Sequence, residues 1–185
     1  GKEAIIAMDQ ETTRLVKLAR KGNQDAFTQL MLAHEPTLSR VAMSLLKNPE
    51  DAADAVQDAI LAAWQSMESL RQVRYFKTWL VRILINKCYR IGSLRSKHSH
   101  SQLEEALDCS EQPDWDQTLD VRSTLGNLKE EDRLILGLHY YDGLSVREIA
   151  RALEVSEDCV KQRLYRGRKR FQTAYLKREE LCHDK

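Results

Sequence analysis

Residues 144–170 read LSVREIARALEVSEDCVKQRLYRGRKR, and this stretch decides the fold. Ser145 is followed three residues later by Glu148, which is the pattern of a capping box at the start of a helix. A tight turn at residues 154–155 leads to Ser156, a good N-cap for a second helix. Val160 and Leu164, four residues apart, would face the first helix. Two short helices with a tight connection predict a helix-turn-helix.

The second helix of this motif carries a polar and basic outer face. A helix of this kind fits the major groove, where its first turns reach base edges and its later cations reach phosphates. An ordinary helical hairpin with a solvated basic face is the alternative, but the cap, the apolar spacing and the cations agree on DNA binding. The residues expected to face DNA are Lys161, Gln162, Arg163, Tyr165, Arg166 and Arg168.

The composition indicates an all-α protein. Among 185 residues there are only seven glycines and three prolines, and no stretch alternates apolar and polar residues over the length of a strand. No run approaches 18 apolar residues, so we expect no insertion into a membrane. The four cysteines form no C-x-x-C pair and no common zinc spacing with histidine, so no metal and no cofactor are expected, and a cytoplasmic location is favoured.

The net charge of +1 hides a strong segregation of charge along the chain. Residues 48–70 hold five acids and no Lys or Arg, whereas residues 71–97 hold eight cations and no acid. Residues 98–121 are acidic again, and residues 161–170 hold six cations and no acid. Two separate basic segments, each on a predicted helix, indicate two contacts with a polyanion rather than solvated helix faces.

Helical periodicity divides the chain into two small helical domains joined by a flexible acidic linker. Two helices are expected within residues 9–46, a third begins at Asn48-Pro49, and a fourth covers about 76–91. On the fourth helix, a second stripe of aromatic and cationic character lies beside the apolar one. We therefore predict a tag or disordered start at 1–9, a first domain at 10–95, a linker at 96–118, a second domain at 119–175 and a tail at 176–185.

Three segments resemble the sigma-70 family of RNA polymerase factors, in its extracytoplasmic-function (ECF) group. NPEDAADAVQDAILAAWQ (48–65) is similar to the N-P-x-D-A-E-D-x-V-Q-E-x-F-L-x-x-W helix of region 2, and FKTWLVRILINKCYRI (76–91) to its F-x-x-W-L-x-R-I-x-x-N segment. Residues 130–171 resemble region 4 over its whole length. The three matches occur in the family's order and cover most of residues 20–172.

For the first domain, the resemblance implies two surfaces. The acidic helix would dock on the coiled coil of the polymerase β′ subunit through Asp54, Gln57 and Asp58, with Asp58 in place of the usual Glu. The following loop and helix would read the melted −10 element, with one flipped base in a pocket and cations along the backbone. The residues implied are Arg71, Arg74, Phe76, Trp79, Arg82, Ile83, Asn86, Lys87 and Arg90.

For the second domain, the resemblance implies binding to the β flap and recognition of the −35 element by the second helix of the helix-turn-helix. Asp158-Cys159 stand where the family usually has Gly-Thr, and Gln162 replaces a common Ser, so the promoter sequence stays open. The implied function is transcription initiation in a stress response, without catalysis. An anti-sigma factor is the further partner implied, one that can hold the protein at the membrane.

Three other classes of protein account for the sequence less completely. A response-regulator type of transcription regulator explains residues 144–170 equally well, but not the acidic and basic pair of helices at 48–91. An enzyme lacks support, because the chain has no Gly-rich phosphate loop, no H-E-x-x-H and no G-x-S-x-G. A pure interaction protein would not need the cations of the second helix.

Overall fold

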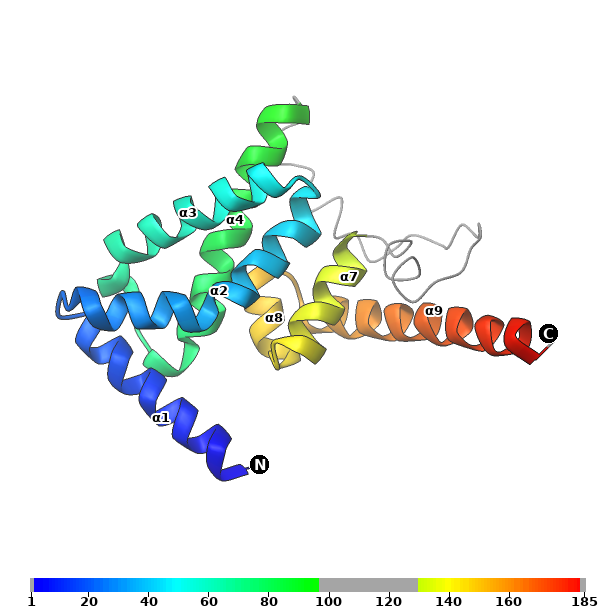
Figure 1. Ribbon diagram of the computed structural model, residues 1–185, viewed down its shortest axis with the longest axis horizontal. Helices are drawn as coiled ribbons and strands as arrows, with labels where there is room; N and C mark the ends of the chain where they lie inside the picture. Colours follow the sequence, from blue (N-terminus) through cyan, green and yellow to red (C-terminus); the bar gives the residue numbers. More distant parts are fainter. Residues whose placement is uncertain (1, 97–129, 184–185) are drawn as a thin grey trace. The chain divides into compact units, whose positions relative to one another are not determined.

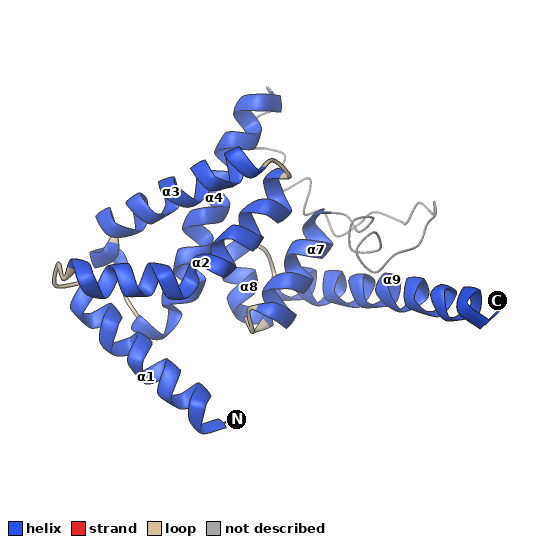
Figure 2. Ribbon diagram, viewed as in Figure 1, coloured by secondary structure: helices blue, strands red, loops and turns tan. Residues whose placement is uncertain are grey.

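The computed structural model describes residues 2–96 and 130–183, and every element in these ranges is a helix (Figure 2). The chain divides into two compact units, Gly1–Ser96 and Lys97–Lys185. The all-α prediction is therefore confirmed. The expected linker at 96–118 lies outside the described residues except for Ser96, and so does the start of the expected second domain.

Four helices form the first unit: α1 (Lys2–Ala19), α2 (Gln24–Leu46), α3 (Pro49–Gln65) and α4 (Phe76–Ser96) (Figure 1). Helix α2 contacts α1, α3 and α4, and α3 also packs along α4. Apolar side chains from all four helices fill the space between them, because each helix has one apolar stripe to bury. The core includes Val16, Leu30, Leu38, Val41, Ala59, Leu80 and Leu84.

Capping residues set the helix boundaries in this unit. The Asn23 side chain accepts a hydrogen bond from the Ala26 amide and begins α2. At the other end of α2, Lys47 has a φ of 55°, the left-handed conformation that often ends helices. Asn48 then caps α3 by accepting from the amides of residues 50 and 51, with Pro49 at the first helical position, as predicted.

Helix α2 runs through Pro36 without a break. Proline has no amide hydrogen, so the bond that residue 36 would donate to the carbonyl of residue 32 is missing. Both Pro36 and Leu32 are exposed, so that carbonyl lies on the side of the helix where water can satisfy it. The packed side of α2 keeps its hydrogen bonds.

Three helix ends differ from the sequence-based expectation. Helix α1 begins at Lys2, although residues 1–9 were expected to be a tag or a disordered start. Helix α4 continues past Gly92, and α9 (Glu157–His183) includes most of the expected tail. A glycine inside a helix costs only about 1 kcal/mol relative to alanine, so Gly92 does not have to end α4.

The second unit contains α7 (Glu130–Leu136), the π-helical turn η3 (Gly137–Tyr141), α8 (Val146–Leu153) and α9. The capping box of Ser145 and Glu148 is present in full, and Glu154, at a φ of 58°, ends α8. Helices α7 and α8 both pack on α9. Their shared core comprises Ile135, Leu138, Ile149, Leu153, Val160 and Leu164, so the predicted helix-turn-helix is confirmed.

A close approach between α7 and α9 depends on Gly167. A Cβ atom built on Gly167 would lie 2.8 Å from Cδ1 and 3.1 Å from Cγ of Leu136. Any larger residue would have to displace Leu136 or separate the helices. Gly167 thus lets the middle of α9 lie directly on α7, which fixes the face that α9 turns to solvent.

Candidate nucleic-acid interface

The loop between α3 and α4 is held by two apolar side chains. It contains two short 3₁₀ turns, η1 (Met67–Ser69) and η2 (Val73–Tyr75). Met67 and Leu70 are buried and anchor the loop to the core, while Arg71 and Arg74 remain exposed. The Arg74 guanidinium lies 4.7 Å from the centre of the Tyr75 ring, a cation–π distance, and its Nε donates to Oε1 of Gln72 at 3.1 Å.

Helix α4 presents a row of exposed polar side chains at a spacing of four residues: Arg82, Asn86 and Arg90. Beside this row lie the half-buried Trp79, Ile83 and Lys87. From Trp79 to Arg90 the helix rises about 16 Å, at 1.5 Å per residue. The opposite side of α4 is core, since Leu80, Leu84 and Cys88 are buried there.

Phe76 lies beneath this surface rather than on it. Its ring is buried, and its centre is 5.9 Å from that of Trp79 and 5.3 Å from that of His34. Phe76 therefore supports Trp79 from below. The structure brings the expected −10 residues together on the loop and on one side of α4, with Phe76 in a supporting position.

Helix α3 carries the acidic surface. Asp54, Gln57 and Asp58 are exposed, while Ala55 and Ala59 on the opposite side are buried. Leu61, one turn after Asp58, is 56% exposed on the same face. Leu61 was not among the residues predicted from sequence, although a leucine that departs from the buried stripe of an amphipathic helix is a usable signal.

The first turns of α9 carry most of the residues expected to read the −35 element. Ser156 begins the helix by accepting a hydrogen bond at its Oγ from the Cys159 amide, at 3.1 Å. Lys161, Gln162, Tyr165 and Arg168 are exposed, and Arg166 is half-buried.

Lys161, the first cation of α9, pairs with a carboxylate on its own helix. Lys161 donates from Nζ to Oδ1 of Asp158 at 3.0 Å, and this hydrogen bond raises the pKa of the lysine. The pair thus places a carboxylate next to the first cation of the helix.

Arg163 was expected to face DNA, but its side chain is buried. Its side chain is only 3% exposed and points into the core of the second unit, where Nη1 lies 3.6 Å from Oδ1 of Asp132 on α7. Arg170 reaches the same carboxylate, donating to Oδ2 at 2.7 Å. Arg163 lies four residues after Cys159, on the buried stripe of α9.

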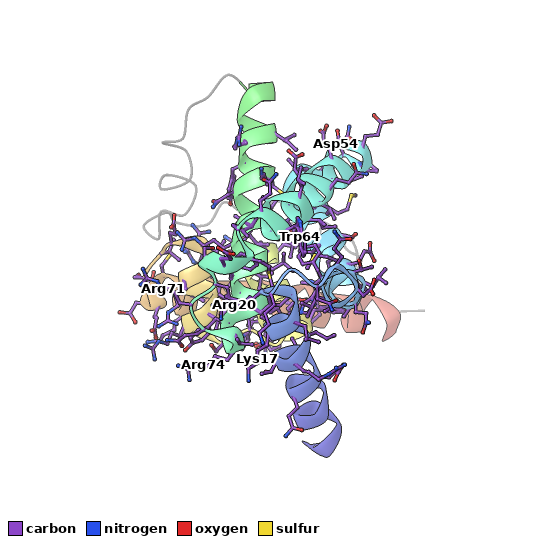
Figure 3. All side chains as sticks on the ribbon, turned by 90° about the vertical axis from the view of Figure 1, so that its left-hand side faces the viewer. Lys17, Arg20, Asp54, Trp64, Arg71 and Arg74 are labelled. Atoms are coloured by element: carbon purple, nitrogen blue, oxygen red, sulfur yellow. The ribbon has the colours of Figure 1, made fainter. Side chains whose placement is uncertain are left out.

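Two basic residues near the loop were missed. Lys17 and Arg20 are exposed on the last turn of α1 and at its end, and α1 packs against η2. Figure 3 shows them in the same part of the first unit as Arg71 and Arg74, away from Asp54. No sequence signal indicated this, because more than 50 residues separate Lys17 from Arg71 along the chain.

Other kinds of site find no support among the described residues. No helix in residues 2–96 and 130–183 is long and apolar enough to cross a membrane. Within the same residues, no group of three or more His, Cys, Asp or Glu side chains is arranged to hold a metal ion.

Two family models match the chain. Sigma-70 region 2 matches residues 30–99, and Sigma-70, region 4 matches residues 118–171. The ECF RNA polymerase sigma factor SigM of Mycobacterium tuberculosis is 33% identical over 151 residues, which cover 81% of this chain and 77% of SigM. SigW of Bacillus subtilis, also an ECF sigma factor, is 28% identical over 179 residues, covering 87% of this chain and 95% of SigW.

Solved structures give the same likeness. CnrH in complex with the cytosolic domain of CnrY is 31% identical with a TM-score of 0.64, covering 88% of this chain and 96% of CnrH. The sigma factor RpoE in complex with the anti-sigma factor NepR from Bartonella quintana is 25% identical with a TM-score of 0.63, covering 80% and 96%.

Proposed function

Because the chain belongs to the extracytoplasmic-function group of the sigma-70 family, we propose how its surfaces divide the work of transcription initiation. The chain binds core RNA polymerase and directs it to promoters through −10 and −35 elements. In this proposal it performs no catalysis of its own. It adds DNA-recognising surfaces to an enzyme that lacks them.

The loop and α4 capture the melted strand of the −10 element. Recognition of single strands needs stacking surfaces together with cations that follow the backbone. Trp79 supported by Phe76 offers the first, and the exposed Arg82 and Arg90 offer the second. Asn86 lies between these arginines, with both a donor and an acceptor available for a base edge. The remaining contacts come from Arg71, Arg74, Ile83 and Lys87.

Helix α3 docks on the polymerase, on the coiled coil of the β′ subunit. Asp54 and Asp58 supply charge that attracts a basic partner and repels an acidic one. Leu61 supplies an apolar contact beside them, since an exposed leucine loses its unfavourable hydration when a partner covers it. The acidic surface is thus suited to a partner that presents cations around an apolar patch.

Helix α9 reads the −35 element in duplex DNA. Lys161 and Gln162 lie in its first two turns, where side chains reach base edges. Arg166 and Arg168 lie further along the helix, where side chains reach phosphates. Asp158 adds a feature of its own, because its carboxylate holds Lys161 and can itself accept from a cytosine amino group. We place Tyr165 at the edge of this contact and leave the buried Arg163 out of it.

An anti-sigma factor is a partner of this chain. The solved relatives CnrH and RpoE are each bound to another protein, CnrY and the anti-sigma factor NepR respectively. An inhibitor that covers the acidic surface of α3 would block docking on polymerase by direct competition. We propose that such an inhibitor can also hold the chain at a membrane.

One observation carries the proposal: each of the two family matches contains a helix with exposed cations outside and a complete apolar core beneath. In the first match this is α4, and in the second it is α9. A helix built only for packing would not need its outer face to be cationic twice in one chain.

A pull-down with purified core polymerase tests the proposal, comparing the wild type with Asp54→Arg/Asp58→Arg. Reversing both charges makes α3 basic and sets it against a basic surface of polymerase. A resulting loss of about 3 kcal/mol in binding free energy weakens binding roughly 100-fold. The control Glu35→Arg/Glu68→Arg makes the same charge change at exposed acids outside this face and should bind within about threefold of the wild type. A wild type that does not bind polymerase would overturn the assignment, and equal losses in both variants would overturn α3 as the docking surface.

A further inference from the structure

Two cations lie at the C-terminal end of α1: Lys17 in its last turn and Arg20 directly after it. Lys17 and Arg20 are exposed, each directly after a buried residue, Val16 and Ala19 respectively. Arg14, one turn earlier, is different because its guanidinium donates to the Glu11 carboxylate at 2.7 Å. Neither Lys17 nor Arg20 forms a salt bridge with any residue that the structure describes.

These two cations lie next to the loop that begins the −10 surface. Helix α1 packs against η2, which contains Arg74, and α4 starts directly after η2. Figure 3 shows Lys17, Arg20, Arg71 and Arg74 in the same part of the first unit. The cations at the end of α1 therefore lie beside the basic loop that leads into α4.

A purely local role exists for basic residues at this place. Cations in the last turn of a helix interact favourably with its dipole, by about 0.3–1 kcal/mol. This accounts for the presence of positive charge on any helix end. It does not account for a helix end that packs against an exposed basic loop, where further cations repel those of Arg71 and Arg74 unless a polyanion binds them all.

We propose that Lys17 and Arg20 bind the sugar-phosphate backbone of the melted promoter strand where it leaves the −10 readers. The inference rests on the proposed function of α4. Upstream of the −10 element the DNA is duplex as far as −35, so only the downstream continuation is single-stranded. The Tyr75 ring lies 4.7 Å from the Arg74 guanidinium, and the half-buried Trp79 follows one turn into α4. Aromatic rings among cations suit a single strand better than a duplex.

The test uses holoenzyme reconstituted from core polymerase and the full chain, with fork-junction DNA selected by the wild-type holoenzyme from a randomised library. One probe ends its single strand at the −10 element, and a second continues it by about ten nucleotides. Binding is measured over a series of salt concentrations. Each phosphate contact on a single strand contributes about 0.7 to the slope of log K against log salt, so Lys17→Gln/Arg20→Gln should reduce the slope by roughly 1.4.

The reduction is expected only on the longer probe. The control Arg14→Gln/Lys47→Gln removes the same charge, from the neighbouring turn of α1 and from the far end of α2, about 35 Å along that helix from Asn23. It should keep the wild-type slope on both probes. Lys17→Arg/Arg20→Lys retains both charges and should also bind as the wild type does.

Each other outcome overturns the proposal. If Lys17→Gln/Arg20→Gln binds both probes like the wild type, the two cations serve only the helix dipole. If it weakens both probes equally, the contact is with the duplex or with polymerase. If wild-type holoenzyme binds neither probe, both the proposed function and this extension of it are wrong. If wild-type holoenzyme binds both probes and the variant binds them equally well, only the extension is wrong.

Discussion

His34 shows how one half-buried side chain makes the first unit sensitive to pH. Its Nδ1–H donates to the carbonyl of Leu30 at 2.8 Å, and its ring meets the edge of Phe76, the residue that supports Trp79. Burial lowers the pKa of His34 below its ordinary value, and the nearby positive charge of Lys77 acts in the same direction, against the hydrogen bond to Leu30. The ring is therefore neutral in the folded protein at neutral pH.

The first prediction concerns the stability of this unit in mild acid. In the unfolded chain His34 binds a proton near pH 6.5, whereas in the folded chain its pKa is lower. The contribution of neutral His34 to the free energy of unfolding is therefore complete above pH 6.5 and is lost as the pH falls towards the folded pKa. The free energy of unfolding should fall from pH 7.5 to 5.0 by less in His34→Gln than in the wild type. Denaturant titration at both pH values measures this difference, and an equal or larger fall in the variant contradicts the assignment.

At the scale of elements, a buried ion network joins α7 to α9. The carboxylate of Asp132 on α7 forms salt bridges with Arg163 and Arg170 of α9, and both Asp132 and Arg163 are almost completely buried. Charges in such a place cost several kcal/mol to desolvate, and their mutual attraction offsets that cost only while all partners are present. The network therefore fixes how α9 is rotated on α7, and with it which side chains α9 turns outward.

The second prediction separates stability from DNA reading at Arg163. Asp132→Ala leaves a buried arginine without its carboxylate and should lower the free energy of unfolding of this unit by about 3–5 kcal/mol. Asp132→Ala/Arg163→Met removes the stranded charge and should recover part of that loss. Well below the unfolding temperature, Arg163→Met should keep promoter affinity within about threefold, whereas loss of a base-reading arginine costs about 1–3 kcal/mol of discrimination.

Lost base discrimination in Arg163→Met, with unchanged stability, would contradict this structural role. Thermal unfolding and binding to base-substituted −35 probes, both measured on the same preparation, provide the two readouts. Arg168→Ala is the matched comparison, because Arg168 is exposed on the same helix and should weaken binding without a comparable loss of stability.

The sequence predicted elements best where a side chain acts locally. Asn48-Pro49 and the Ser145–Glu148 box define helix starts through hydrogen bonds within four residues, and both were correct. The predicted end of α4 and the predicted exposure of Arg163 were wrong, because each feature depends on a residue far away along the chain. Gly92 packs near Leu46, and Arg163 meets Asp132, 31 positions away along the chain. A polar residue on a basic helix gives no local sign of such a partner.

The same limit applies to the candidate surfaces. The stripe on α4 was predictable because Trp79, Arg82 and Asn86 recur at helical spacing within one segment. Lys17 and Arg20 were not, because only the packing of α1 on η2 brings them to that surface. Residues that share a helix can be grouped from sequence, whereas residues grouped by tertiary packing need the structure.

At the scale of the whole molecule, the two helices proposed to recognise DNA, α4 and α9, belong to different compact units. Each helix rests on its own set of buried residues, Leu80 and Leu84 under α4, and Val160 and Leu164 under α9. Joining two binding modules in one chain makes the second contact intramolecular, so modest affinities combine into a strong one. The combination requires that each surface acts on its own stretch of promoter.

The last prediction tests that independence with Arg82→Ala on α4 and Arg168→Ala on α9. Changes at sites that share no partner add within about 0.5 kcal/mol, so the double variant's loss of promoter affinity should equal the sum of the single losses. Trp79→Ala/Arg82→Ala, within one helix, should depart from additivity because its two side chains contact the same strand. On a probe with a −10 strand and no −35 duplex, Arg168→Ala should have no effect, while Arg82→Ala keeps its full effect. An effect of Arg168→Ala on that probe would mean that α9 acts through polymerase or through the −10 surface, and the division of promoter reading between the two units would be wrong.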